Sequence, residues 1–282
     1  MEIHRVGVVG AGTMGNGIAH IFARSGYRVV LYDLELKFLE RAQQNIAKNL
    51  DREAAKGKLS EQEKKAALQR IELATDRDKL ADCDFVVEAV SEKFAVKEEI
   101  FRHLDKVCQP EVILSSNTSS ISITRLAAGT QRPDKIVGMH FFNPVPVMKL
   151  VEIVRGLDTS EQTLQTVHGL ALKLAKSPVE VKDAPGFISN RVLMPLLNEA
   201  MFAVMEGVAA PEAVDEIFKM GMAHPMGPLA LADFIGLDVC LDIMRVLQEG
   251  FGDPKYRPCP LLIKMVEGGR LGKKSGHGFY QY

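Results

Sequence analysis

Two residues of the chain, His140 and Glu152, have the types and spacing of an acid–base pair. His140 ends an apolar segment, 136–140, and Glu152 lies within a second one, 150–154. If these segments are antiparallel strands of a hairpin centred on Pro146, the imidazole and the carboxylate face each other. A carboxylate that engages one ring nitrogen fixes the tautomer and stabilises imidazolium, as a histidine general base requires. The spacing therefore predicts proton transfer at His140, oriented by Glu152.

A glycine-rich segment from Gly10 to Gly15 has the spacing of a dinucleotide-binding turn. Gly10 permits a tight turn, Gly12 lets the backbone approach a pyrophosphate, and Gly15 lets a helix pack closely on a strand. Asp33 stands eighteen residues after Gly15, where a carboxylate accepts from the ribose hydroxyls of NAD and repels the 2′-phosphate of NADP. Because Leu34 beside it carries no positive charge, NAD is favoured over NADP.

Each of these features also has a purely structural explanation. The glycines could form only a turn, and His140 could be a buried histidine that a nearby acid satisfies. The polar run 115–120 follows an apolar segment and is typical of a turn with an N-cap for the next helix. At the carboxyl end of a strand, however, the same run would offer hydroxyls and an amide to a cofactor or substrate.

Short apolar segments alternate with longer amphipathic ones over the first 180 residues. Most of the short segments are continuous runs rich in Val and Ile, as expected for strands covered on both faces. This alternation predicts an α/β fold, a Rossmann-type, mostly parallel sheet with helices on both sides. The predicted strands are 5–9, 28–32, 85–90, 112–116, 136–140, 150–154 and 179–181, and the predicted helices are 13–25, 36–55, 61–70, 94–108 and 161–175.

The pattern changes at Pro185 and Gly186, which mark a break in the chain. Beyond them no segment is typical of a strand, and apolar residues recur at three- and four-residue spacing. Helices are predicted at 188–206, 211–219, 237–247 and 261–267. We therefore expect an NAD-binding domain, 1–184, followed by an all-α C-terminal domain, 185–282.

The composition excludes several classes of protein. The 282 residues include 35 Lys and Arg against 36 Asp and Glu, a net charge of −1 that is not typical of nucleic-acid binding. No apolar run approaches the roughly 20 residues that span a bilayer, so no membrane partner is expected. The four cysteines lie far apart without CxxC spacing, which favours reduced thiols in a cytoplasmic protein and no metal site.

Together the motifs resemble the 3-hydroxyacyl-CoA dehydrogenase family, most closely its short-chain bacterial branch, which acts on 3-hydroxybutyryl-CoA. The resemblance covers essentially the entire chain. The segments that carry it are 10–15, 116–120, 138–144, 148–152, 185–191, 224–228 and 272–276. It implies reversible, NAD-linked oxidation of an L-3-hydroxyacyl-CoA to the 3-ketoacyl-CoA.

The resemblance also implies roles for individual residues. His140 would be the base and Glu152 its partner, while Ser119 and Asn190 would hydrogen-bond the substrate oxygen. A helical hairpin after the second strand would bind coenzyme A, with Arg52 and Lys56 near its phosphates. The C-terminal domain would contribute to the substrate cleft and form a homodimer. The residues implied in cofactor binding are Gly10, Gly12, Thr13, Met14, Gly15, Asp33, Glu92, Lys97, Ser119, Asn143 and Lys274.

Three alternatives remain open at this point. Dehydrogenases of 3-hydroxyadipyl-CoA share these motifs but would need a cation for the distal carboxylate. Sugar-acid dehydrogenases resembling lambda-crystallin share them too, yet would have no use for the basic stretch 48–58. A non-catalytic NAD-binding protein would bind the dinucleotide without turnover.

Overall fold

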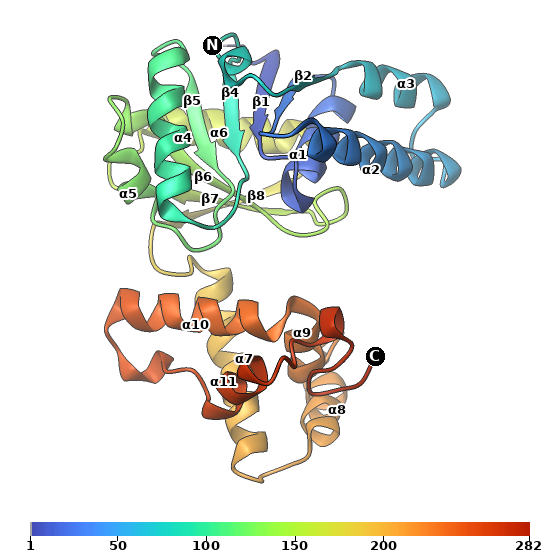
Figure 1. The fold of residues 1–282 in the computed structure, drawn as a ribbon, viewed down its shortest axis with the longest axis vertical. Coiled ribbons are helices and arrows are strands. Elements are labelled where there is room, and N and C mark those ends of the chain that lie inside the picture. The colour runs from blue at the N-terminus through green and yellow to red at the C-terminus, as the bar shows by residue number, and fades with distance from the viewer. Residues whose placement is uncertain (1) are drawn as a thin grey trace. The chain divides into compact units, whose positions relative to one another are not determined.

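The computed structural model describes residues 2–282, which divide after Asp183 into two compact units (Figure 1). Each unit has an apolar core of its own. No helix among the described residues is both long and apolar enough to cross a membrane.

The first unit is built on one eight-stranded sheet with the order β3-β2-β1-β4-β5-β6-β7-β8. Neighbouring strands are parallel in every pair except β6 and β7, which are antiparallel. This topology confirms the prediction of a Rossmann-type, mostly parallel sheet. The strands are β1 (Arg5–Val9), β2 (Arg28–Tyr32), β3 (Ile71–Ala74), β4 (Phe85–Glu88), β5 (Ile113–Ser116), β6 (Ile136–Phe141), β7 (Leu150–Arg155) and β8 (Ser177–Lys182).

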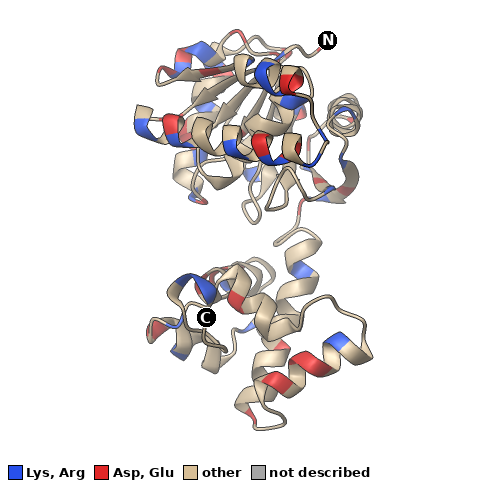
Figure 2. Cartoon of the chain, turned by 90° about the vertical axis from the view of Figure 1, so that its right-hand side faces the viewer, with Lys and Arg blue, Asp and Glu red and all other residues tan. Residues whose placement is uncertain are grey.

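Helices cover the sheet, and most of the Lys, Arg, Asp and Glu residues of this unit lie on helices and loops (Figure 2). One pair of helices, α2 and α3, packs together and extends beyond the sheet (Figure 1). Ser60 begins α3 with a capping box, in which its hydroxyl accepts from the Glu63 amide at 3.2 Å and the Glu63 carboxylate accepts in return from the Ser60 amide at 2.8 Å. The helices are α1 (Thr13–Arg24), α2 (Leu36–Ala55), α3 (Glu61–Gln69), α4 (Phe94–Val107), α5 (Ile123–Ala127) and α6 (Glu161–Lys173), with 3₁₀ turns at Arg77–Leu80 and Pro133–Lys135.

The second unit is helical. Its core side chains come from all five α-helices. Within its residues 184–282 the structure has no β-strand, only isolated bridges between residues 272, 277 and 281. The helices are α7 (Ser189–Met205), α8 (Pro211–Gly221), α9 (Pro228–Ile235), α10 (Leu237–Phe251) and α11 (Pro260–Glu267), with 3₁₀ turns at Pro254–Tyr256 and Lys273–Ser275.

Three short elements, β3, α5 and α9, were not predicted from the sequence. The strand β3, Ile71–Ala74, includes Glu72 and so lacks a continuous apolar run, and the five residues of the helix α5 are too few to display a helical period. The helix α9 begins at Pro228 in a stretch rich in Pro and Gly, which is typical of a loop. Proline at the first helical position needs no hydrogen-bond donor there, so the stretch is compatible with a helix start.

Candidate active site

The β6–β7 hairpin brings His140 and Glu152 together, as the spacing predicted. They are register partners, and Nδ1 of His140 lies 2.8 Å from a carboxylate oxygen of Glu152. Both residues are buried, at 8% and 3% exposure, and the centroid of the Phe142 ring lies 4.7 Å from that of the imidazole, with the two rings tilted by 44°. With Nδ1 engaged by the carboxylate, Nε2 is the ring nitrogen suited to exchange a proton with a substrate.

The polar run after β5 is organised around the carboxylate of Glu92. That carboxylate accepts from the Ser119 amide at 2.9 Å and from the Ser120 hydroxyl at 2.9 Å. The Thr118 hydroxyl donates to the same oxygen. Burial raises the pKa of Glu92, but nearby Lys97 and these hydrogen bonds outweigh it and lower the pKa below its ordinary value. Glu92 is therefore ionised at neutral pH and fixes the backbone that carries Ser119.

A fully buried ion pair supports this arrangement from the end of β4. The Glu88 carboxylate accepts from Nζ of Lys97 at 2.7 Å, from the Ser116 hydroxyl at 2.6 Å and from the Val90 amide at 2.7 Å. Lys97 is only 1% exposed and also pairs with Glu92 at 3.3 Å. Glu88 was missed in the sequence, although an acid that ends a strand of otherwise apolar residues is a signal that could have found it.

Asn117 joins the ends of two strands. Its side-chain Oδ1 accepts from the Phe141 amide at 2.9 Å, immediately beyond His140, while its backbone N–H donates to the Glu88 carbonyl at 2.8 Å. The polar run after β5 thus fixes the end of β6 as well as its own turn, and its role is more than that of a helix cap.

The glycine-rich turn fits a dinucleotide. Gly10 has φ of +101°, which favours glycine, and a Cβ built on Gly15 would lie 1.7 Å from the Gly10 carbonyl oxygen. A Cβ on Gly12 would meet nothing within 4 Å, so the space beside this residue is open. No side chain caps the first turn of α1, so its amide groups point to the place where a pyrophosphate would bind.

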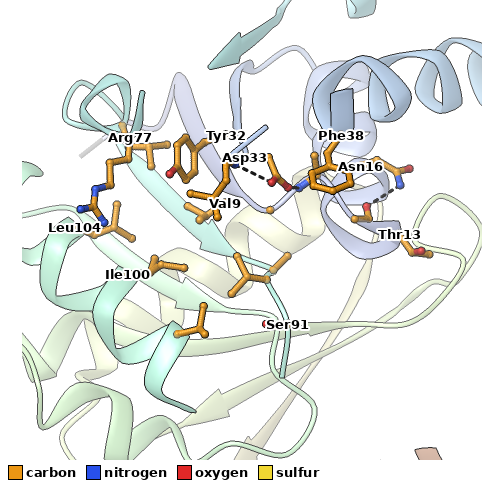
Figure 3. Close-up of a pocket in the computed structure, with 18 of the residues that line it drawn as sticks. Val9, Thr13, Asn16, Tyr32, Asp33, Phe38, Arg77, Ser91, Ile100 and Leu104 are labelled. Atoms are coloured by element: carbon orange, nitrogen blue, oxygen red, sulfur yellow. Dashed lines mark hydrogen bonds between the residues drawn. The ribbon is translucent and has the colours of Figure 1, made fainter. Parts of the chain in front are cut away.

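A cavity of about 590 Å³ begins at this turn and ends between α4 and the 3₁₀ turn at Arg77–Leu80. Figure 3 shows Thr13 and Asn16 at one end, Tyr32 and Leu104 at the other, and Asp33 between them. Its lining residues include Gly10, Ala11, Gly12, Thr13, Asn16, Tyr32, Asp33, Leu34, Phe38, Arg41, Asn45, Arg77, Leu80, Glu99, Ile100, His103 and Leu104.

Asp33 has two roles in this cavity. Its Oδ2 accepts from the Ala11 amide at 2.7 Å and its Oδ1 from the Leu34 amide at 2.8 Å. The carboxylate therefore holds the glycine-rich turn as well as lining the place where a ribose would lie. The cavity, the open glycine and the uncapped helix together fit the shape and charge of NAD.

The remaining predicted site residues are described here by their own surroundings. Met14 packs partly buried against the core of the first unit, and Asn143 is exposed on the loop between β6 and β7. Arg52 is exposed on α2, and Lys56 is exposed at its end. In the second unit Asn190 lies in the first turn of α7, and Nζ of Lys274 lies 2.5 Å from the carboxylate of Asp238.

Comparison with known proteins agrees with this geometry. Residues 5–184 match the family described as "3-hydroxyacyl-CoA dehydrogenase, NAD binding domain", and residues 186–282 match its C-terminal domain. A protein of Bacillus subtilis named probable 3-hydroxybutyryl-CoA dehydrogenase is 56% identical over 282 residues, covering 100% of this chain and 98% of its own length. A 3-hydroxybutyryl-CoA dehydrogenase of Bradyrhizobium diazoefficiens is 52% identical, covering 99% of this chain and 96% of its own.

A solved structure shows the same fold. The crystal structure of (S)-3-hydroxybutyryl-CoA dehydrogenase from Ralstonia eutropha has a TM-score of 0.97 to this chain at 50% identity, covering 100% of this chain and 99% of that one. The two family domains, matched at residues 5–184 and 186–282, together span nearly all of the sequence. The chain belongs to the 3-hydroxyacyl-CoA dehydrogenase family of NAD-dependent oxidoreductases.

Proposed function

We propose that the protein catalyses the reversible, NAD-dependent oxidation of L-3-hydroxybutyryl-CoA to acetoacetyl-CoA. The observation that carries this proposal is the buried His140–Glu152 pair, whose Nδ1 to carboxylate distance is 2.8 Å, at the end of a sheet that also carries a dinucleotide cavity. The names of relatives that are 56% and 52% identical over nearly the whole chain support the choice of a short acyl group.

The two residues divide the acid–base work. In the oxidation, His140 accepts the hydroxyl proton of the substrate through Nε2 as the C3–H bond breaks. Bound NAD would accept the hydride that leaves C3. Glu152 keeps Nδ1 protonated and offsets the positive charge that His140 gains. Ser119 and Asn190 hydrogen-bond the substrate oxygen and so favour the alkoxide-like charge that develops there.

NAD would be held by residues of the cavity and of its surroundings. Gly10, Gly12 and Gly15 shape the turn for the pyrophosphate, and Asp33 accepts from the ribose hydroxyls. Because Lys97 is almost fully buried and paired with Glu88, we assign it a role through Glu92 rather than a direct contact. The further cofactor residues in this proposal are Thr13, Met14, Glu92, Ser119, Asn143 and Lys274.

The α2–α3 helical pair would bind coenzyme A. Arg52 and Lys56 are exposed near the end of α2, where cationic side chains can meet its phosphates. We place the domain boundary after residue 184, one residue beyond the division of the structure at Asp183, and we propose that the helical domain contributes to the substrate site and to a homodimer. Exposed Ile217, Met220 and Met222 of α8 and its C-cap supply apolar surface for such an interface. The buried, unpaired cysteines are in keeping with a cytoplasmic protein.

A comparison of substrates tests the activity. NADH oxidation is followed by absorbance with acetoacetyl-CoA, with a 3-oxodicarboxylyl-CoA and with the keto form of a free sugar acid, and NADPH replaces NADH in a parallel series. We expect the largest kcat/KM with acetoacetyl-CoA and NADH. A larger value with the dicarboxylyl-CoA would reassign the substrate, and NADH binding without turnover of any compound would overturn the enzymatic assignment.

A further inference from the structure

A buried lysine lies beneath the loop that joins β6 to β7. Lys176 is 6% exposed, and its Nζ donates to the carbonyls of Val145 and Met148, the latter at 2.7 Å. Within the loop itself, the amides of Val147 and Met148 both donate to the Pro144 carbonyl, at 2.9 and 3.0 Å. The lysine thus ties two points of the loop to a segment more than 25 residues away in the sequence.

The backbone around Lys176 is built to bring it there. The helix α6 ends at Lys173, and Ala175 then adopts φ of +56°, a conformation that residues other than glycine rarely take. After this turn the Lys176 amide donates to the Ala171 carbonyl at 3.0 Å, and the Ser177 amide donates to the Lys149 carbonyl at 2.8 Å as β8 begins. The turn therefore brings the start of β8 alongside the loop.

Other elements pack against the same loop and lysine. Val145 is buried against Gly17 of α1, where a Cβ would lie only 2.8 Å from the Val145 Cβ. Burial, helped by nearby Arg24 of α1 and opposed by Glu53 of α2, lowers the pKa of Lys176 to about 8. Burying an ammonium group in this way is unfavourable unless its hydrogen bonds compensate. Within the described residues, the hydrogen bonds that Nζ of Lys176 donates all go to carbonyls of the loop, so the loop is what compensates for its burial.

We propose that Lys176 is a positioning residue for the catalytic hairpin, which holds the β6–β7 loop through the Val145 and Met148 carbonyls. This loop is the direct connection between His140 and Glu152, so its position bears on the distance between imidazole and carboxylate. The inference rests on the proposed function, because it takes that pair to be the acid–base machinery. A charged donor to two carbonyls makes stronger hydrogen bonds than a neutral one, which suits a fixed loop.

Lys176→Met tests the proposal, because methionine keeps the length and apolar stem and removes the donors. We expect kcat with acetoacetyl-CoA to fall about 10- to 100-fold, as for a displacement of reacting groups by a fraction of an ångström to 1 Å. The Kd of NADH should stay within about twofold, since the dinucleotide cavity does not include this residue. Lys176→Arg should recover part of kcat, and exposed Lys173, at the end of α6, provides the control Lys173→Met.

Amide hydrogen exchange gives a readout that does not need turnover. In Lys176→Met the Val147 and Met148 amides should exchange faster than in the wild type, and in Lys173→Met they should not. If Lys176→Met does not fold, Lys176→Gln, which keeps a shorter and uncharged donor, takes its place in both measurements.

The outcomes separate this proposal from the proposed function. An unchanged kcat or unchanged loop exchange in a folded Lys176→Met protein would overturn the role of Lys176. Parallel losses of kcat, NADH affinity and thermal stability would also overturn it, because they indicate general damage. A wild-type protein without turnover of acetoacetyl-CoA would refute the proposed function, and loop exchange would still decide whether Lys176 holds the loop.

Discussion

Both units of the protein bury carboxylates, but they satisfy them with different partners. In the first unit Glu152 lies against His140 and Glu88 against Lys97, each beside a side chain that carries or can gain a positive charge. In the second unit Asp233 accepts from two backbone amides, each at 3.0 Å, and from the Tyr282 hydroxyl at 3.2 Å.

Asp215, another buried carboxylate of the second unit, is likewise held by backbone amides and a tyrosine hydroxyl. Asp215 accepts from the Leu229 and Ala230 amides at 2.8 and 2.9 Å, and so caps the start of α9 from α8. It also accepts from the Tyr280 hydroxyl at 2.9 Å. Burial and the nearby carboxylates raise the pKa of Tyr280 above its ordinary value and that of Tyr282 to about 12. These tyrosines therefore stay neutral donors, and the pairs serve to fix the C-terminal segment.

The difference teaches that burial alone does not identify a catalytic carboxylate. A carboxylate held by amides and tyrosine hydroxyls has no partner that titrates near neutral pH. One held against an imidazole at the carboxyl edge of a parallel sheet can support proton transfer. The partner and the position in the fold, rather than the depth, separate Glu152 from Asp233.

The largest expected effect comes from removing the imidazole. His140→Ala should lower kcat about 10²- to 10⁴-fold, the usual contribution of a positioned acid–base group. The Kd of NADH should change little, since His140 does not line the dinucleotide cavity. Steady-state kinetics and NADH titration measure both, and the exposed His168 of α6 gives the control His168→Ala. Comparable turnover in His140→Ala would remove this residue from the mechanism.

The counterpart in the second unit should affect stability instead. Asp233→Ala leaves the Phe279 and Tyr280 amides without their acceptor, and each unsatisfied buried donor costs about 1–3 kcal/mol. We expect the free energy of unfolding to fall by about 3 kcal/mol in urea denaturation. Asp242→Ala, at an exposed position of α10, should change it by less than about 0.5 kcal/mol. Equal stability of the two variants would contradict the structural role of Asp233.

The sequence allowed correct predictions where the functional residues follow the regular spacing of the strands and helices that carry them. The alternation of strands and helices predicted the fold, and the symmetry of two apolar segments about Pro146 predicted the register of His140 and Glu152. The strands β1 and β2 likewise have the predicted bounds, because every residue after the initial arginine of each is buried, and strands covered on both faces favour continuous apolar runs.

The supporting contacts could not be predicted in this way. Lys176 bonds to backbone carbonyls, and every residue except proline offers the same backbone groups, so the partners leave no mark in the sequence. The burial of Lys97 was equally hidden, because a lysine on an amphipathic helix is ordinarily exposed. Whether such a residue is buried depends on tertiary packing rather than on local pattern.

Glu53 tests the limit of the comparison, because it is a largely buried carboxylate that lies beside Arg24 and His20, outside the catalytic pair. Burial raises its pKa, but His20 and Arg24 outweigh this and lower it from 4.5 to about 2. A depressed carboxylate pKa stabilises the fold above pH 4.5, and this contribution is lost as pH falls through about 2. Glu53→Gln should therefore lower the free energy of unfolding at neutral pH by about 2 kcal/mol.

The pH dependence supplies the check on Glu53. In denaturant titrations between pH 7 and about pH 2, the difference between wild type and Glu53→Gln should shrink once the pH is below 4.5. The control Glu161→Gln changes an exposed carboxylate on α6 and should show only a small difference. A constant difference for Glu53→Gln at all pH values would mean that packing, rather than charge, accounts for its effect.

Asp33 lies between the two kinds of carboxylate, and its substitution should have the smallest effect of the four. It is bonded to backbone amides, as Asp233 is, but it lines the dinucleotide cavity. Asp33→Asn keeps an acceptor for one amide and removes the charge that repels a 2′-phosphate, so the preference for NADH over NADPH should fall at least about tenfold. Glu99→Gln removes the same charge from the same cavity and should leave the ratio of kcat/KM values unchanged. An equal ratio in wild type and Asp33→Asn would show that Asp33 serves only to hold the turn at Ala11, which would place it with the structural carboxylates of the second unit.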